Sequence, residues 1–286
     1  MIIYHESKAQ YLADVDNNGL KQKLVDTFRA KTGSVPADHR VWADEYRAFA
    51  QALQYARTDD DIEVAIEYHI SAAGRFRVDA LLAGHDGRTD SALIVELKAW
   101  DTADLSDVPE MVISPIGGRT VSQHPSLQAR KYKGLILRFN QDIEDQAIRL
   151  ESAAYLFNLH RRTPEPLEDT RYQHILQDSP IFLANDVSQL RGFIERTVPR
   201  KPQKKVIALI EGGRLRPTAE LVNRVSSMLE GNDEFDLIDE QNTCALTGCP
   251  CHGTMRVRIG RRAQTGSNKW DVSTRAKAWS STGWAS

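Results

Sequence analysis

The chain has 286 residues, with 37 lysines and arginines against 39 aspartates and glutamates, so its formal net charge is −2. This length allows one large domain or a domain with an appendage, and the 41% apolar share is enough for a packed core. No stretch approaches the roughly 18 apolar residues of a membrane span, and residues 1–6 lack the features of a signal peptide. All three cysteines lie within residues 244–251, so a protein of a reducing cytoplasm, without a membrane partner, is expected.

The first third of the chain is predicted to be mostly helical. Apolar residues recur at three- and four-residue spacing over residues 6–15 and 20–29, and Asn17-Asn18-Gly19 separates these two helices. A third helix is predicted over residues 37–56, and its apolar face consists of Val41, Trp42, Tyr46, Phe49 and Leu53. Glu45 lies beside this face, where it is either a solvated carboxylate or a site residue.

Two strand-forming regions follow. Residues 62–70 alternate, which predicts a strand with Ile62, Val64, Ile66, Tyr68 and Ile70 on one side and Glu63, Ala65, Glu67 and His69 on the other. Residues 76–83 and 92–100 are predicted to form a β-hairpin, because the intervening residues 85–90 contain Asp86-Gly87, a strong turn pair.

The hairpin carries the most informative side chains of the sequence. Glu96 and Lys98 are expected to point to one face of the second strand, and Asp79 can join them from the first strand. Charged groups are costly on an otherwise apolar strand unless they have a role. Two carboxylates and a lysine can hold a divalent ion and orient water against a phosphate. The alternative is a set of strand-face salt bridges that also includes Arg77.

The middle of the chain completes an α/β pattern. Residues 101–121 are predicted to form a long irregular loop, and Ser126 is predicted to cap the next helix. On that helix Gln128 and Tyr132 are four residues apart, so they share one face, and the cations beside them are Arg130, Lys131 and Lys133. Strands are expected at residues 152–158 and 180–184, and a helix at 187–196. The order of elements predicts an α/β fold with a mixed sheet flanked by helices.

The end of the chain differs in character. Residues 199–205 are predicted to be a linker, and residues 206–241 a small, partly helical module with a helix at 218–230. Residues 242–286 are basic and lack periodicity, so we expect a disordered or frame-shifted tail. Four soft ligands in this tail, Cys244, Cys249, Cys251 and His252, have no common zinc-site spacing.

The combination of motifs resembles the PD-(D/E)XK nuclease superfamily. Asp79 and Glu96-x-Lys98 are on paired strands, and Gln128-x-x-x-Tyr132 follows about thirty residues later and resembles the helix motif of RecB-type members. The resemblance implies a restriction-endonuclease-like sheet, with Asp79 and Glu96 binding Mg²⁺ or Mn²⁺ and Lys98 contacting the attacking water or the phosphate. Gln128 and Tyr132 would support the site or face the nucleic acid, and either Glu45 or Glu67 would complete the metal site.

Residues 1–241 as a whole are similar to bacterial proteins in which such a domain precedes a Schlafen-type (group 3) DNA/RNA helicase motor. Residues 237–241 resemble the adenine-reading segment before that motor, but no Gly-Lys-Ser/Thr phosphate loop occurs anywhere in the chain. We therefore expect no ATP binding by this polypeptide.

The sequence thus predicts a Mg²⁺-dependent nuclease domain acting on DNA or RNA, with Arg130, Lys131 and Lys133 contacting phosphates. Two alternatives stay open at this point. One is a catalytically silent module that binds nucleic acid or docks to a partner, and the other is the N-terminal fragment of an ATP-dependent helicase.

Overall fold

The computed structural model describes residues 1–34, 42–70 and 76–216. Its main sheet has six strands in the order β1-β2-β3-β4-β8-β9. The first four are successively antiparallel, whereas β8 and β9 are parallel to β4. These strands are Ile2–Ser7, Glu63–His69, Arg77–His85, Asp90–Lys98, Arg149–Leu156 and Ile181–Leu183. The predicted α/β fold with a mixed sheet is therefore confirmed.

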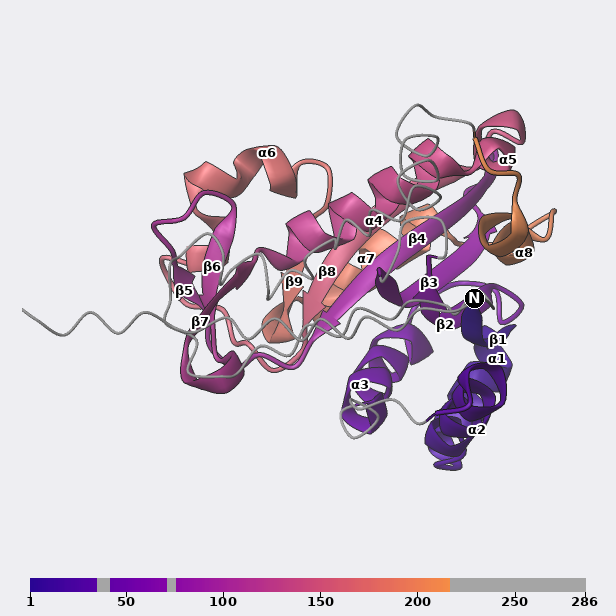
Figure 1. Ribbon diagram of the computed structural model, residues 1–286, viewed down its shortest axis with the longest axis horizontal. Helices are drawn as coiled ribbons and strands as arrows, with labels where there is room; N and C mark the ends of the chain where they lie inside the picture. Colours follow the sequence, from indigo (N-terminus) through magenta and orange to yellow (C-terminus); the bar gives the residue numbers. More distant parts are fainter. Residues whose placement is uncertain (35–41, 71–75, 217–286) are drawn as a thin grey trace, which may run out of the picture. The chain divides into compact units, whose positions relative to one another are not determined.

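Helices cover both faces of this sheet (Figure 1). One face packs against α1, α2, α3 and α7, which span Lys8–Asp16, Leu20–Thr32, Trp42–Gln54 and Val187–Thr197. The other face packs against α4, α5 and α8, which span Pro125–Phe139, Gln141–Asp145 and Val206–Gly212. Because buried side chains of β3 and β4 contribute to both clusters, these central strands are apolar along nearly their whole length.

The predicted hairpin is present as β3 and β4. Residue pairs run from His85 opposite Asp90 to Ala80 opposite Val95. Gly87 at the turn has a φ of 102°, a left-handed conformation that glycine adopts without steric cost. The predicted strands near residues 152–158 and 180–184 are β8 and β9, and the predicted helix at 187–196 is α7.

The predicted loop over residues 101–121 is only partly irregular. It contributes to a second, three-stranded antiparallel sheet in the order β5-β6-β7, whose strands are Asp104–Leu105, Met111–Ser114 and Thr120–Gln123. These strands are two to four residues long, which is too short for an alternation signal. The short helix α6, Gln173–Leu176, belongs to the same end of the molecule, where a third apolar cluster lies.

Two expectations about the N-terminal half are wrong. The first helix begins at Lys8 rather than residue 6, because residues 2–7 form the edge strand β1, paired with β2. The predicted alternation of β2 also fails beyond Ile66. Val64 and Ile66 face α3, whereas Tyr68 and Ile70 face the opposite cluster. The reversal occurs at Glu67, whose φ of 56° turns the backbone into the left-handed region.

Helix α4 is capped by a different residue from the one predicted. His124, not Ser126, is the N-cap, and its Nδ1 accepts a hydrogen bond from the Ser126 backbone N–H at 3.2 Å. Pro125 occupies the first helical turn, which suits a residue with no N–H to donate. Ser126 itself is completely buried.

The predicted linker, residues 199–205, is attached to the main sheet in this structure. Backbone N–H groups of Gln203 and Lys204 donate to the Asp90 carboxylate at 2.8 and 3.1 Å, and Arg200 forms a β-bridge with His85. Helix α8 then buries Val206, Ile207 and Ile210 against the sheet. The helix predicted at residues 218–230 and the cysteine-containing tail lie outside the described residues.

No helix within the described ranges is both long and apolar enough to cross a bilayer.

Candidate metal-binding fork of the central hairpin

The two strands of the hairpin separate at Asp79. The β3–β4 ladder ends at Ala80 opposite Val95, and one residue further Asp79 Oδ2 accepts a hydrogen bond from the Leu97 backbone N–H at 2.9 Å. The carboxylate thus takes the place of a backbone carbonyl of β3. We call this opening, formed by Asp79, Glu96 and Lys98, the fork.

Glu96 and Lys98 are in direct contact in the fork. Lys98 Nζ is 2.7 Å from Glu96 Oε1, and the Glu96 side chain is only 1% exposed. The other carboxylate oxygen, Glu96 Oε2, is buried and has no hydrogen-bond partner within the described ranges. A buried carboxylate oxygen that accepts no hydrogen bond is costly, and Glu96 when protonated can donate to the neighbouring Asp79 carboxylate.

The surroundings in the fork raise the pKa values of both Glu96 and Lys98. Burial, and then the Asp79 carboxylate, raise the pKa of Glu96 to about 8, and the opposing effect of Lys98 is too small to cancel them. Burial alone lowers the pKa of Lys98, but the Glu96 and Asp79 carboxylates outweigh it, so this pKa is raised. Lys98 is therefore a fixed positive charge, and the proton that can leave the fork near neutral pH is on Glu96.

Glu67 is engaged by side chains outside the fork. Its Oε1 accepts a hydrogen bond from the Tyr46 hydroxyl, and its Oε2 is 3.1 Å from Arg77 Nε and 3.9 Å from His69 Nε2. The left-handed backbone at Glu67 is what turns this carboxylate onto the α3 face of the sheet, where Tyr46 packs. Arg77 and Tyr46 together compensate a carboxylate that is 1% exposed.

Glu45 approaches the same region from α3. It lies in the first turn of that helix and is half-buried. Its charge contributes to raising the pKa of Lys98, after burial and the larger effects of Glu96 and Asp79. Of the two predicted candidates for a third carboxylate, Glu67 is therefore held by Arg77, and Glu45 lies in the first turn of α3.

Gln128 and Tyr132 form the predicted pair on α4. Gln128 Nε2 donates to the Tyr132 hydroxyl at 2.8 Å. The Tyr132 ring is buried against the sheet and makes an edge-on contact with Phe76, with ring centroids 6.1 Å apart. The pair thus packs on the side of the sheet opposite to α3.

The three predicted phosphate-contacting cations differ in their surroundings. Arg130 donates to the His174 carbonyl at 3.0 Å and is 3.8 Å from the Asp178 carboxylate, and Lys133 is 3.1 Å from the Glu151 carboxylate. Both side chains are therefore held by their own chain. Lys131 is more exposed and lies on the solvent side of α4.

The donor set of the fork suits magnesium better than zinc. Within residues 1–34, 42–70 and 76–216, no group of three or more His, Cys, Asp or Glu side chains is arranged to hold a metal ion. Mg²⁺, however, commonly takes one or two protein carboxylates and keeps several waters. Asp79 and Glu96 provide this number, and the donor-free Glu96 Oε2 is the atom a cation would satisfy.

Searches against family models, curated proteins and solved structures found no match to this chain.

Sequence reasoning missed several residues of this region. Tyr46 was expected only as a core residue, and nothing in a helical apolar stripe indicates that its hydroxyl reaches Glu67 on β2. Arg77 was expected only as a salt-bridge partner in the alternative reading. The role of the Leu97 N–H follows from where the ladder ends, which alternation does not reveal.

Proposed function

We propose that the chain is a metal-dependent nuclease that hydrolyses phosphodiester bonds in DNA or RNA. One observation carries the proposal: Asp79, Glu96 and Lys98 meet where the hairpin opens, and Glu96 Oε2 has no donor among the described residues. Two carboxylates and one lysine form a set that can hold a divalent cation beside a phosphate.

Each residue of the fork has a distinct role in this proposal. Asp79 and Glu96 hold Mg²⁺ or Mn²⁺, which when bound lowers the pKa of a coordinated water and offsets negative charge on the phosphate. Lys98, whose raised pKa keeps it protonated, places a positive charge beside the phosphate oxygen where negative charge develops. Glu96 must lose its proton before it can bind the cation.

We assign the supporting carboxylate to Glu45 rather than Glu67. Glu67 is compensated by Arg77 and Tyr46, so it fixes β2 and β3 against α3. Glu45 is half-buried and affects the pKa of Lys98, which places its charge near the fork. Gln128 and Tyr132, joined by their mutual hydrogen bond, lie on α4 where it packs against the sheet.

Cleavage of labelled single- and double-stranded DNA and RNA tests the function. Wild type is compared with Lys98→Ala in Mg²⁺ or Mn²⁺, with EDTA as the metal-free control. Lys205→Ala, an exposed lysine outside the fork, controls for loss of charge. We expect metal-dependent cleavage that Lys98→Ala reduces by at least a hundredfold and Lys205→Ala leaves unchanged. Cleavage that survives Lys98→Ala would refute the site.

A catalytically silent binding module is the second candidate. It is favoured by the 2.7 Å contact between Lys98 Nζ and Glu96 Oε1, which satisfies both groups without any metal. Absence of cleavage with every metal, together with nucleic-acid binding in a gel shift, would select this candidate.

A further inference from the structure

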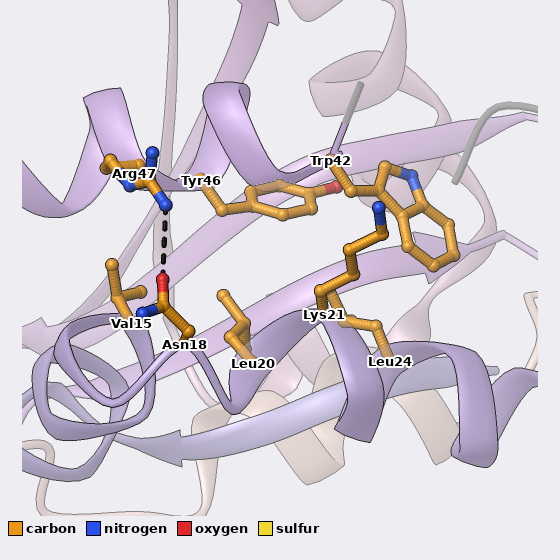
Figure 2. Close-up of a pocket in the computed structure, with 8 residues that line it drawn as sticks. All are labelled: Val15, Asn18, Leu20, Lys21, Leu24, Trp42, Tyr46 and Arg47. Atoms are coloured by element: carbon orange, nitrogen blue, oxygen red, sulfur yellow. Dashed lines mark hydrogen bonds between the residues drawn. The ribbon is translucent and has the colours of Figure 1, made fainter. Parts of the chain in front are cut away.

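A cavity of about 130 Å³ lies among the three N-terminal helices. Figure 2 shows its apolar walls, and they are formed by Val15 of α1, Leu20 and Leu24 of α2, and the rings of Trp42 and Tyr46 of α3. An apolar cavity of about 150 Å³ in another protein binds benzene, so a space of this size admits one six-membered ring.

The mouth of the cavity is cationic. Lys21 of α2 and Arg47 of α3 line it, and both side chains are exposed. Arg47 Nη2 donates to Asn18 Oδ1 at 3.2 Å, which holds the guanidinium at the opening (Figure 2). Neither cation forms an ion pair with a residue in the described ranges. Two cations without an acidic partner among the described residues, beside an apolar cavity, favour a ligand with a ring and an anionic group.

Tyr46 connects this cavity to Glu67 of β2. Its ring lines the cavity, while its hydroxyl donates to Glu67 on the far side. Burial raises the pKa of Tyr46, followed by the charges of Glu67, Asp79 and Glu45, so the hydroxyl faces the acidic region. One side chain therefore separates the cavity from the Glu67 carboxylate.

We propose that this cavity binds one pyrimidine base of the substrate strand, while Lys21 and Arg47 contact the adjoining phosphates. The inference rests on the proposed nuclease function. Aromatic walls stack and bury a base, and cations track the backbone, as in other single-strand sites. A base inside a duplex cannot enter such a cavity without leaving its stack. The preferred substrate is thus a strand with an unpaired base, such as single-stranded DNA or RNA or a frayed end.

Photocrosslinking locates the bound base directly. A single-stranded oligonucleotide carrying one 5-iodouracil is bound in EDTA, so that nothing is cut, irradiated, and the crosslinked peptides are identified by mass spectrometry. We expect the crosslink in the peptide that contains Trp42 and Tyr46. Crosslinks confined to other parts of the chain would overturn the proposal.

A matched pair of variants tests the cavity itself. Val15→Phe fills it, whereas Val25→Phe makes the same change at a half-buried α2 position that does not line it. Fluorescence anisotropy with the same oligonucleotide should show at least tenfold weaker binding by Val15→Phe and unchanged binding by Val25→Phe. Equal binding by two folded variants would refute the cavity.

The cations give a test that leaves the core untouched. Lys21→Ala and Arg47→Ala should each reduce the slope of log K against log salt by about 0.7, the value for one phosphate contact on a single strand. Arg29→Ala, an exposed cation of α2 away from the cavity, should leave the slope unchanged. The salt-dependence measurement and the crosslink together test base binding in the cavity even if Val15→Phe does not fold.

Competition separates a base in a strand from any small aromatic acid. Thymidine monophosphate should displace the oligonucleotide at a concentration at least tenfold lower than benzoate does. Equal displacement would overturn the nucleobase assignment.

Failure of the nuclease proposal gives a different result. Crosslinks at Trp42 or Tyr46 without any metal-dependent cleavage would support base binding in the cavity and refute the nuclease proposal. Lys98-dependent cleavage without those crosslinks would support the nuclease proposal and refute base binding in the cavity.

Discussion

The carboxylate of Asp79 accepts a hydrogen bond from the backbone N–H of Leu97 at 2.9 Å, immediately beyond the last residue pair of the β3–β4 ladder. This bond keeps the separated strands at a fixed spacing. It occupies Oδ2, and the Asp79 carboxylate is also hydrogen-bonded to the Glu96 carboxyl, so a cation would replace that second contact. Asp79 therefore has both a structural role and a role in the charge of the fork.

Two substitutions of Asp79 should separate these roles. Asp79→Ala leaves the buried Leu97 N–H without an acceptor, which should lower the free energy of unfolding by about 1–3 kcal/mol. Asp79→Asn retains an oxygen acceptor and should cost less than about 1 kcal/mol. Urea unfolding without added metal measures both, and Asp16→Ala, an exposed position on α1, is the control. Equal losses for the two Asp79 variants would contradict a structural bond to Leu97.

Glu96 should make the folded chain less stable as the pH rises. Its pKa is about 8 in the folded state against an ordinary value of 4.5, so between these values only the folded state holds the proton. The free energy of unfolding then falls by at most roughly 1.4 kcal/mol per pH unit as the pH rises, because the unfolded state binds fewer protons than the folded state. In urea unfolding from pH 5 to 8 without metal, Glu96→Gln should remove this part of the slope.

The control for that measurement is Glu6→Gln, which removes an exposed carboxylate of β1. It should leave the pH dependence of stability as in wild type. A slope that Glu96→Gln does not change would show that the Glu96 carboxyl titrates in the folded chain as it does in water.

Binding of Mg²⁺ should release a proton. A metal ion takes the ionised carboxylate, and at pH 7 the Glu96 carboxyl is mostly protonated, because its pKa is about 8. Isothermal titration calorimetry in two buffers of different ionisation enthalpy should therefore give close to one released proton per ion at pH 7 and nearly none at pH 9. Asp79→Asn and Glu96→Gln should abolish binding, and Asp16→Asn should not. Tight binding that survives Glu96→Gln would place the metal elsewhere.

The parts of the fold that were predicted correctly depend on local signals. Asp86-Gly87 identifies the hairpin, and the alternation of β4 places Val95 and Leu97 together in the cluster under α3, as predicted for side chains that share one face. The spacing of Gln128 and Tyr132 likewise predicts their contact, because four residues make about one helical turn.

What could not be predicted depends on tertiary contacts. The reversal of β2 at Glu67 requires a positive φ that glutamate rarely adopts, and its compensation by Tyr46 and Arg77 comes from two other elements. The edge strand β1 is stabilised by its pairing with β2, so its six residues give little signal alone. The donor-free oxygen of Glu96 follows from packing in three dimensions.

The choice between Glu45 and Glu67 as the supporting carboxylate can be settled by comparing stability with metal affinity. Glu67→Gln leaves Arg77 facing a neutral side chain, so it should lower the free energy of unfolding by about 1–3 kcal/mol. Its Mg²⁺ affinity should stay within threefold of wild type. Glu45→Gln, at a half-buried helix position, should cost less than about 1 kcal/mol but weaken Mg²⁺ binding by about tenfold or more.

Tyr46→Phe extends the comparison, because it removes the hydroxyl that donates to Glu67 and leaves Glu45 intact. It should resemble Glu67→Gln, with reduced stability and nearly unchanged metal affinity. The matched control is Tyr11→Phe, which removes a buried hydroxyl that donates to the Tyr46 carbonyl at 2.7 Å, one residue beyond Glu45. It should also lower stability without changing metal affinity. Loss of Mg²⁺ affinity in Glu67→Gln but not in Glu45→Gln would reverse the assignment, since Glu67 would then leave Arg77 to bind the ion.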